Sequence, residues 1–291
     1  MFSNAACGHQ HSLLHGSRSI TSLGTARSAG NSFVHSTAFE ALSRAGFVAR
    51  ALVYGIIGVL ALEVATGTGG KLTNQQGALR TVANEPFGEI LLTVLAVGLG
   101  GYAAWRLIRA AIGHGPEASD SGFERTAGFA SGVAYAAMCA VAVGILAGAH
   151  QDQSGSPKKT TADVFGWPGG TWIVGIAGAV FVGIGLYQAY RGATKAFLKD
   201  SKVEEMGLLV KRSFGWIGLI GHLARGVVFV LVGTFLVKEA VEYRPHDAVG
   251  LDGALAKLAD RSDGPLALGV VAAGLIAFAL YSLTDARYHR I

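Results

Sequence analysis

Long apolar stretches alternate with polar ones along the chain after residue 43. Each stretch reaches the roughly 20 residues that a helix needs to cross the hydrocarbon core of a bilayer. A helix is the expected structure, because the unpaired edges of an open sheet cannot lie in lipid. The predicted spans are residues 45–66, 87–110, 126–148, 170–192, 214–238 and 265–285. The pattern therefore predicts an all-α transmembrane bundle of six helices.

The composition agrees with a membrane protein. The chain is 51% hydrophobic and 15% charged, whereas soluble proteins average about 25% charged residues. Its net charge of +5 comes from bases dispersed among the loops, and a nucleic-acid-binding protein would gather them on one face. We therefore expect the lipid bilayer as partner and no nucleic acid, and we leave protein partners open.

The positions of lysine and arginine predict the orientation. Most of them precede the first span, follow the last one, or lie between the second and third and the fourth and fifth spans. Cytoplasmic loops of membrane proteins are enriched in these residues. We therefore expect both termini in the cytoplasm of a multi-pass plasma-membrane protein. The residues concerned are Arg18, Arg27, Arg44, Arg106, Arg109, Arg125, Arg191, Lys195, Lys199, Lys202, Lys211, Arg212, Arg287 and Arg290.

The first part of the chain, residues 1–43, is rich in serine and histidine and lacks the apolar core of a signal peptide. We expect a disordered cytoplasmic tail. Its arginines and scarcity of acids leave an organellar presequence open. A metal-binding alternative rests on Cys7, His9, His11 and His15. Since no folded frame is expected around these residues, we predict no metal site.

An internal repeat is the clearest signal in the sequence. The stretch ARALVY at residues 49–54 returns as ARGVVF at residues 224–229. A more diverged middle copy aligns Tyr135 with Tyr54, which places Ser131 at the arginine position. Further matched pairs are Gly58 and Gly233, Gly77 and Gly253, Pro86 and Pro265, and Tyr102 and Tyr281.

We divide the chain into repeat unit 1 at residues 44–113, repeat unit 2 at residues 124–196 and repeat unit 3 at residues 214–288. Each unit contributes two spans, so every unit enters the membrane from the same side. The fold class is therefore a six-helix transmembrane bundle built from three parallel two-helix repeats, related by an axis along the membrane normal.

A short amphipathic helix is predicted between the two spans of repeat units 1 and 3. Its apolar residues recur at i, i+3 and i+4, which places them on one helical face. Such a segment lies at the membrane interface. The apolar positions are Leu79, Val82 and Ala83 in unit 1 and Leu255, Leu258 and Ala259 in unit 3.

Aromatic and basic residues end the second span of each unit. Side chains of these types favour the boundary between membrane and water. We therefore predict interfacial anchors at the cytoplasmic side. They are Tyr102, Trp105 and Arg106 in unit 1, Tyr187, Tyr190 and Arg191 in unit 2, and Tyr281 in unit 3.

Two arginines, Arg50 and Arg225, occupy equivalent positions inside apolar spans. Arg50 lies about 9 Å into its helix from Arg44, at 1.5 Å per residue. Helical side chains lean toward the N-terminus. We therefore expect both guanidinium groups in the cytoplasmic half of the bilayer, pointing to the inner interface. Acceptors would be lipid phosphates, carbonyls at helix ends or, for Arg225, Asp285.

Anchoring by these arginines competes with a functional interpretation. The aromatic residues Tyr54 and Phe229 follow the arginines by one helical turn, and His222 precedes Arg225 by about one turn. A positive cluster at the inner mouth of a bundle can receive an anion or a lipid phosphate. The candidate site for anionic lipid headgroups is Arg50, Tyr54, His222, Arg225 and Phe229.

The motifs ARxxVY, GALR followed by PFG, and GYAxWR, with the ending DARYHRI, together resemble a bacterial membrane protein family. That family carries the domain of unknown function numbered 1206. The resemblance covers residues 43–291 and implies three tandem two-helix modules with no established activity. Unit 2 departs from the pattern at Ser131 and in its GWPGGTW opening, so the arginine's role is not expected there.

No catalytic motif is found: the chain lacks a Walker loop, a zinc-ligand pair on one helix and a nucleophile elbow. We predict no cofactor and a non-enzymatic, structural or interaction role. The alternative is a transporter or binding protein for a small solute, an anion or a lipid phosphate, using a basic site at the cytoplasmic side. A filled bundle axis would favour the first, and a cavity lined by Arg50, His222 and Arg225 the second.

Overall fold

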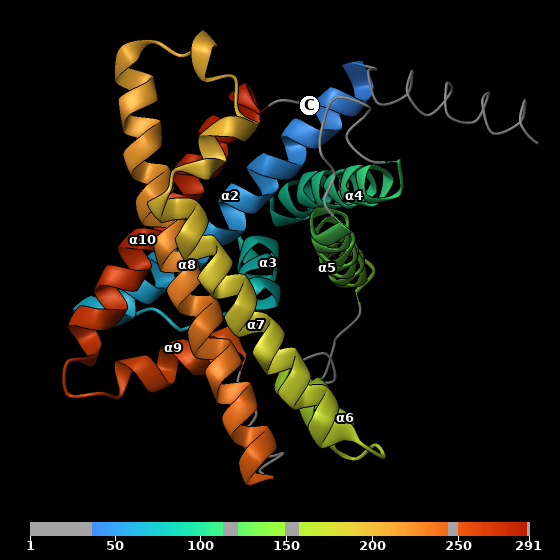
Figure 1. The fold of residues 1–291 in the computed structure, drawn as a ribbon, viewed down its shortest axis with the longest axis vertical. Coiled ribbons are helices and arrows are strands. Elements are labelled where there is room, and N and C mark those ends of the chain that lie inside the picture. Colours follow the sequence, from blue (N-terminus) through green and yellow to red (C-terminus); the bar gives the residue numbers. More distant parts are fainter. Residues whose placement is uncertain (1–36, 113–121, 149–156, 244–249, 290–291) are drawn as a thin grey trace, which may run out of the picture.

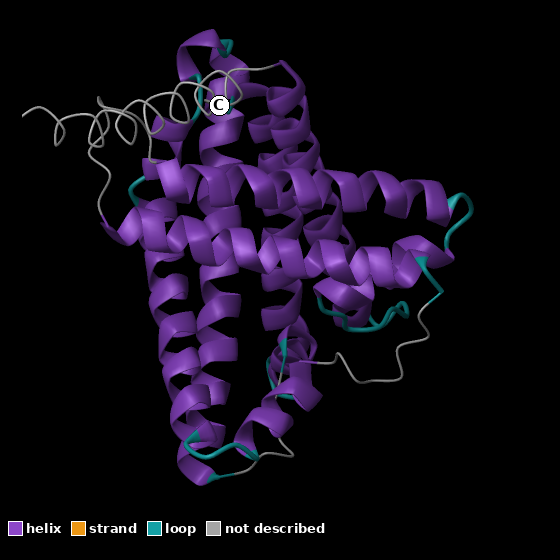
Figure 2. Cartoon of the chain, turned by 90° about the vertical axis from the view of Figure 1, so that its right-hand side faces the viewer, coloured by secondary structure: helices purple, strands orange, loops and turns teal. Residues whose placement is uncertain are grey.

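The protein is described by a computed structural model that places residues 37–112, 122–148, 157–243 and 250–289. Within these ranges the chain forms helices joined by loops (Figure 2). The predicted all-α class is confirmed. The predictions for residues 1–36, including the metal-binding alternative, lie outside the described part.

The long helices match the predicted spans. They are α2 (Thr37–Thr66), α4 (Gly88–Ile112), α5 (Gly122–Leu146), α7 (Gly170–Ala193), α8 (Leu208–Glu242) and α10 (Gly264–Tyr288). All 6 contain a segment long and apolar enough to cross a membrane. Helix α2 begins at Thr37, so the last residues of the expected tail are helical.

Each pair of long helices in a repeat unit is joined through a short helix. The short helices are α3 (Gln75–Asn84), α6 (Pro157–Phe165) and α9 (Leu251–Ala259). Leu79 of α3 and Leu255 of α9 are fully buried, as their predicted apolar faces require. The side chain of Asn74 caps α3 by accepting a hydrogen bond from the backbone N–H of Gly77 at 3.0 Å. Unit 2 has a corresponding helix, which its sequence did not predict.

The helices form a ring in which neighbouring units pack more extensively than the two helices of one unit. The most extensive pairs are α4 with α5, α7 with α8, and α10 with α2. In each pair the second helix of one unit lies beside the first helix of another. Figure 1 shows these pairs running in three different directions, with α4 and α5 seen nearly end-on. Three copies of one contact thus build the fold.

Glycines bring the backbones of α7 and α8 into direct contact. A Cβ atom at Gly185 would lie 2.7 Å from the carbonyl oxygen of Gly226, and one at Gly233 would lie 2.6 Å from that of Gly178. A backbone oxygen cannot move aside as a flexible side chain can. Small residues therefore determine this helix contact, as is common between membrane helices.

The position of Gly233 within its repeat unit holds a small residue in every unit. Gly58 packs against α10, where a Cβ would lie 3.1 Å from the carbonyl oxygen of Ala272. In unit 2 the position holds Cys139, whose Sγ donates a hydrogen bond to the carbonyl oxygen of Ala96 at 3.3 Å. The aligned sequence positions are therefore also equivalent in their packing.

The ring is open within repeat unit 2. Helix α2 packs on α4 and α8 packs on α10, but among the described elements α5 and α7 share no more than marginal contact. In the apolar segment of α5 only 11% is buried, and in that of α7 22%, against at least 44% in each of the other spans. These two helices are therefore the least buried of the spans.

The molecule has two distinct ends. At one, which we call the linker end, the loop between α7 and α8 meets the end of α10: the backbone N–H of Lys202 donates to the carbonyl oxygen of Tyr288 at 2.7 Å. At the other, the hairpin-tip end, Asn74 before α3 donates to Asp252 of α9 at 3.4 Å. The loop between α7 and α8 and the short helices α3 and α9 thus lie at opposite ends, as parallel repeats require.

Candidate functional site

A buried ion pair joins repeat units 1 and 3 at the linker end. The Nη2 atom of Arg50 lies 3.3 Å from Oδ2 of Asp285, and its Nε donates to Oγ of Ser282 at 3.1 Å. Arg50 is 7% exposed and Asp285 2% exposed. The guanidinium carbon also lies 4.7 Å from the ring centroid of Phe47. This arginine is therefore fully engaged inside the protein.

The carboxylate of Asp285 has further partners. Ser201, in the loop between α7 and α8, donates from Oγ to Oδ1 at 3.0 Å, and the ring nitrogen Nδ1 of His289 lies 3.1 Å from the same oxygen. Ser282 donates its own hydroxyl hydrogen to the carbonyl of Phe278 at 2.8 Å. We call Arg50, Ser201, Ser282, Asp285 and His289 the Arg50 network. It ties the linker to two repeat units.

One of the acceptors suggested for Arg225, the carboxylate of Asp285, pairs with Arg50 instead among the described residues. Arg225 lies at the midpoint of α8, and its guanidinium carbon is 5.0 Å from the ring of Phe278. The guanidinium carbon of Arg50 lies 5.3 Å from the same ring, and the Asp285 carboxylate pairs with Arg50, on α2, at 3.3 Å.

Arg225 is surrounded by aromatic rings and has no anionic partner among the described residues. Its guanidinium carbon lies 5.3 Å from the ring centroid of Tyr54, 5.1 Å from Phe229 and 5.0 Å from Phe278. Its Nε is buried without a hydrogen-bond partner, and no described carboxylate forms an ion pair with it. Ring faces attract a half-buried cation by about 1–2 kcal/mol, but they do not neutralise its charge.

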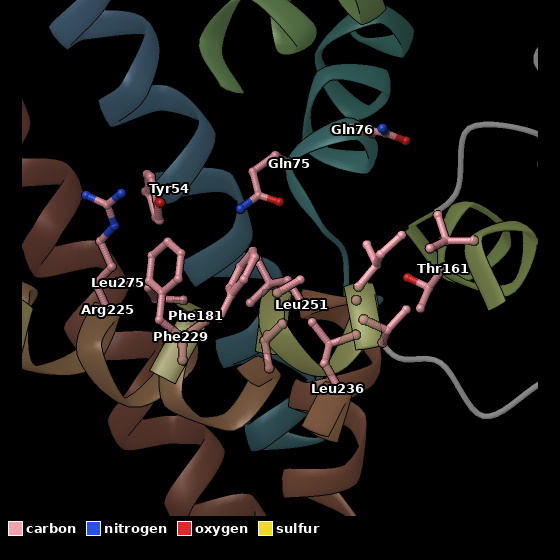
Figure 3. A pocket seen from close by; sticks show the side chains of 17 residues that line it. Tyr54, Gln75, Gln76, Thr161, Phe181, Arg225, Phe229, Leu236, Leu251 and Leu275 are labelled. Carbon is pink, nitrogen blue, oxygen red and sulfur yellow. The ribbon is translucent and has the colours of Figure 1, made fainter. Parts of the chain in front are cut away.

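A cavity of about 390 Å³ begins at Arg225. Figure 3 shows Arg225 at one end and Thr161 and Gln76 at the other, with aromatic and aliphatic side chains between them. Its wall comes from all three units, including the short helices α3, α6 and α9. Ligand pockets in proteins span about 300–1,000 Å³ and are mainly apolar with a few polar groups. The cavity has that size and character.

The five residues of the predicted anion site fall into two groups. Tyr54, Arg225 and Phe229 line the cavity, whereas Arg50 belongs to the Arg50 network. His222 is also outside the cavity wall: its Nδ1 lies 2.8 Å from the carbonyl oxygen of Gly218, and its ring is buried. Sequence reasoning missed the opposite, polar end at Gln75, Gln76 and Thr161, because those residues lie on short helices of different units.

Several of the predicted interfacial anchors lie inside the protein. The structure buries Tyr102, Trp105 and Tyr281, so they contact other helices where headgroup contacts were expected. Tyr102 packs edge-on against Phe47 with ring centroids 5.2 Å apart, because the crossing of α2 over α4 turns this aromatic face inward. The remaining predicted anchors are Arg106, which donates to the Tyr102 hydroxyl, Arg191, which pairs with Asp200, and the exposed Tyr187 and Tyr190.

The chemistry of the cavity suits binding. A guanidinium group can donate two parallel hydrogen bonds to a carboxylate or phosphate, and the apolar wall can hold a hydrocarbon segment. Among the described residues, no group of three His, Cys, Asp or Glu side chains comes together at a possible metal site. The arrangement therefore offers one cation, three aromatic rings and an apolar wall.

Comparison with known proteins identifies the repeat. Residues 45–113, 127–195 and 220–289 each match the family model described as Domain of Unknown Function (DUF1206). The chain is 33% identical over 256 residues to "Uncharacterized protein YxxB" of Bacillus subtilis (strain 168), an alignment that covers 85% of this chain and 90% of that protein. No solved structure matches the chain. Each matched segment contains one two-helix repeat of the fold.

Proposed function

The chain belongs to the family of the Domain of Unknown Function (DUF1206), and we propose that it is a non-enzymatic integral membrane protein that binds an anionic ligand at Arg225. One observation carries the proposal: the guanidinium heads a cavity and has no anionic partner among the described residues. Arg225 is half-buried, and a charge partly withdrawn from water without a counter-charge is unfavourable. An anion in the cavity would supply the missing interaction.

The contrast with Arg50 supports this assignment. Arg50 has a carboxylate, a serine hydroxyl and an aromatic face as partners, so it needs no ligand. Among the described residues, Arg225 has aromatic faces as its partners. The fork geometry of its guanidinium fits a carboxylate or a phosphate, and both are common anions in and near membranes.

We further propose that the protein lies in the plasma membrane with its linker end in the cytoplasm. Lysines and arginines in the loop between α7 and α8, such as Lys202 and Arg212, support this orientation. A cysteine introduced at Lys202 should react with a membrane-impermeant reagent only after permeabilisation, and one at Lys158 should react in intact cells. If the cysteine at Lys202 reacts in intact cells and the one at Lys158 does not, the protein has the opposite orientation.

The test of the binding function is mass spectrometry of the purified protein under conditions that keep ligands bound. We expect an anionic species on the wild-type protein and its loss from Arg225→Gln. The matched control is Arg212→Gln, on the same helix but exposed, which should retain the species. Retention of the same species by Arg225→Gln, or an anion-free wild type, would favour a structural role for the protein.

A further inference from the structure

One stripe of helix α7 lines the cavity and the neighbouring stripe faces outward. Ile173, Ala177 and Phe181, spaced one turn apart, line the cavity. Ile176 and Val180, one residue before Ala177 and Phe181, are 61% and 53% exposed. Since α5 makes at most marginal contact with α7 within the described part of the chain, no described helix covers the outward stripe. The apolar surface that faces the bilayer is therefore adjacent to the cavity wall.

Ile173 belongs to both surfaces, since it lines the cavity and is 48% exposed. In repeat units 1 and 3 the corresponding junction is closed by the packing of α2 on α4 and of α8 on α10. The opening is thus specific to unit 2. It offers a route by which a hydrocarbon chain can pass between bilayer and cavity without crossing a polar surface.

The cavity is elongated along α8. Its wall on this helix runs from Arg225 to Leu236, a distance of about 16 Å at 1.5 Å per residue. Val228 and Val232 lie between them. A bare inorganic anion would engage the arginine and leave this apolar wall unfilled. A hydrocarbon chain attached to the anion would cover it.

We propose that the ligand is a single-chain amphiphile, with an acidic head at Arg225 and an acyl chain along α7 and α8, that reaches the cavity from the bilayer through the open α5–α7 junction. This inference rests on the proposed binding function. The head is a carboxylate or a phosphate monoester, since the guanidinium fork fits both. A second copy of the protein is less suited to the junction, because the exposed apolar faces of α5 and α7 offer no anion to Arg225.

The experiment compares four probes that separate head from chain: dodecanoate, dodecyl phosphate, dodecanol and inorganic phosphate. Binding is measured by the concentration-dependent rise in Tm of the purified protein in a neutral detergent and by mass spectrometry of the complex. We expect the two anionic amphiphiles to bind at least ten times more tightly than dodecanol or inorganic phosphate. The relative strength of the first two identifies the acidic head.

Two pairs of variants locate the head and the chain. Arg225→Gln should weaken dodecanoate binding by about tenfold or more, the effect expected for losing a charge-assisted hydrogen bond, and Arg212→Gln should not. Ala177→Phe places a ring in the cavity stripe of α7 and should abolish binding of the amphiphiles. Val180→Phe adds the same ring on the exposed stripe and should leave binding unchanged. The Tm of each ligand-free variant confirms folding.

The outcomes separate this inference from the proposed function. If inorganic phosphate binds as tightly as dodecyl phosphate and requires Arg225, the proposed anion binding is supported, and the proposal that the ligand carries an acyl chain is wrong. If dodecanol matches dodecanoate, the acidic head is wrong. If Ala177→Phe and Val180→Phe bind alike, the chain does not lie along this stripe. If no probe depends on Arg225, the proposed function fails as well.

Discussion

Arg50 and Arg225 occupy the same position in repeat units 1 and 3, yet their surroundings differ. Arg50 is bonded to Asp285 and Ser282 deep in the protein. Arg225 is held among aromatic rings at the end of a cavity, and no described carboxylate reaches it. The comparison teaches that the position does not determine the role. The residue contributed by the neighbouring unit does.

The ring explains the difference. Each first helix packs against the second helix of another unit. Four residues after the tyrosine repeated in all three units, that second helix presents Arg106, Arg191 or Asp285. Asp285 faces Arg50 and neutralises it. Arg191, on the helix beside Arg225, instead pairs with Asp200. A carboxylate is therefore supplied to one repeated arginine and not to the other.

The largest expected effect comes from removing the carboxylate that distinguishes the two sites. Asp285→Leu leaves Arg50 buried without a counter-charge, which should lower the free energy of unfolding by about 3–5 kcal/mol. The measurement is thermal or denaturant-induced unfolding in detergent. The control is Asp200→Leu, which breaks the half-exposed pair with Arg191 and should cost under about 1 kcal/mol. Equal losses for the two variants would contradict the assigned role of the Arg50 network.

Removing both charges at once should restore much of this loss. In the double variant Arg50→Met with Asp285→Leu no buried charge is left unpaired, and hydrophobic replacement of buried ion pairs is often neutral or stabilising. We expect the double variant to be more stable than Asp285→Leu by at least about 2 kcal/mol. A double-mutant cycle with the single variant Arg50→Met measures the coupling. Additive effects would show that the two side chains do not interact.

A smaller effect is expected at the equivalent position of unit 2. Ser131 lies on α5, which packs so closely on α4 that a Cβ at the adjacent Gly132 would lie 3.2 Å from Cβ of Arg106. Ser131→Asp should therefore gain an attractive interaction with Arg106, and Ser131→Arg a repulsive one. The free energy of unfolding should rise for the first variant and fall for the second, each by about 1 kcal/mol, which a shift in Tm would reveal. If both substitutions change the stability in the same direction, position 131 does not face Arg106 as Arg50 faces Asp285.

The smallest effect is expected at Arg225 in the ligand-free protein. Arg225→Leu loses its interactions with aromatic rings but also removes a half-buried charge, so the stability should change by less than about 1 kcal/mol. Comparison with Arg50→Leu, which strands the buried Asp285, tests this directly by unfolding in detergent. If both variants lose stability equally, Arg225 is a structural residue like Arg50.

Much of the fold was predictable because its signals are local. Span length, the apolar spacing at Leu79 and Val82, and the recurrence of ARALVY each depend on residues near in sequence. The partner of Arg50 was not predictable from such patterns, because it lies in another unit and the order of the ring decides it. One signal did exist: Asp285 replaces an arginine of the other units, and a reversed charge in a repeat indicates a changed contact.

The candidate site was predicted in part for a related reason. The stripe of Tyr54, Phe229 and Arg225 follows from helical spacing and symmetry. The separation of Arg50 and His222 from it depends on how the helices cross. Burial of Tyr102 and Tyr281 was missed because aromatic residues near helix ends look alike in sequence whether they face headgroups or another helix.

The packing of α10 on α2 has a consequence for biosynthesis. Asp285 follows Arg50 by 235 residues, so at about 5–20 residues per second the ribosome needs on the order of ten seconds or more to supply the carboxylate. Throughout that time the first inserted helix carries a charge whose eventual protein partner does not yet exist. A chain that stops short of its last helix keeps this charge uncompensated in the membrane. The Arg50–Asp285 pair therefore distinguishes a finished polypeptide from a truncated one.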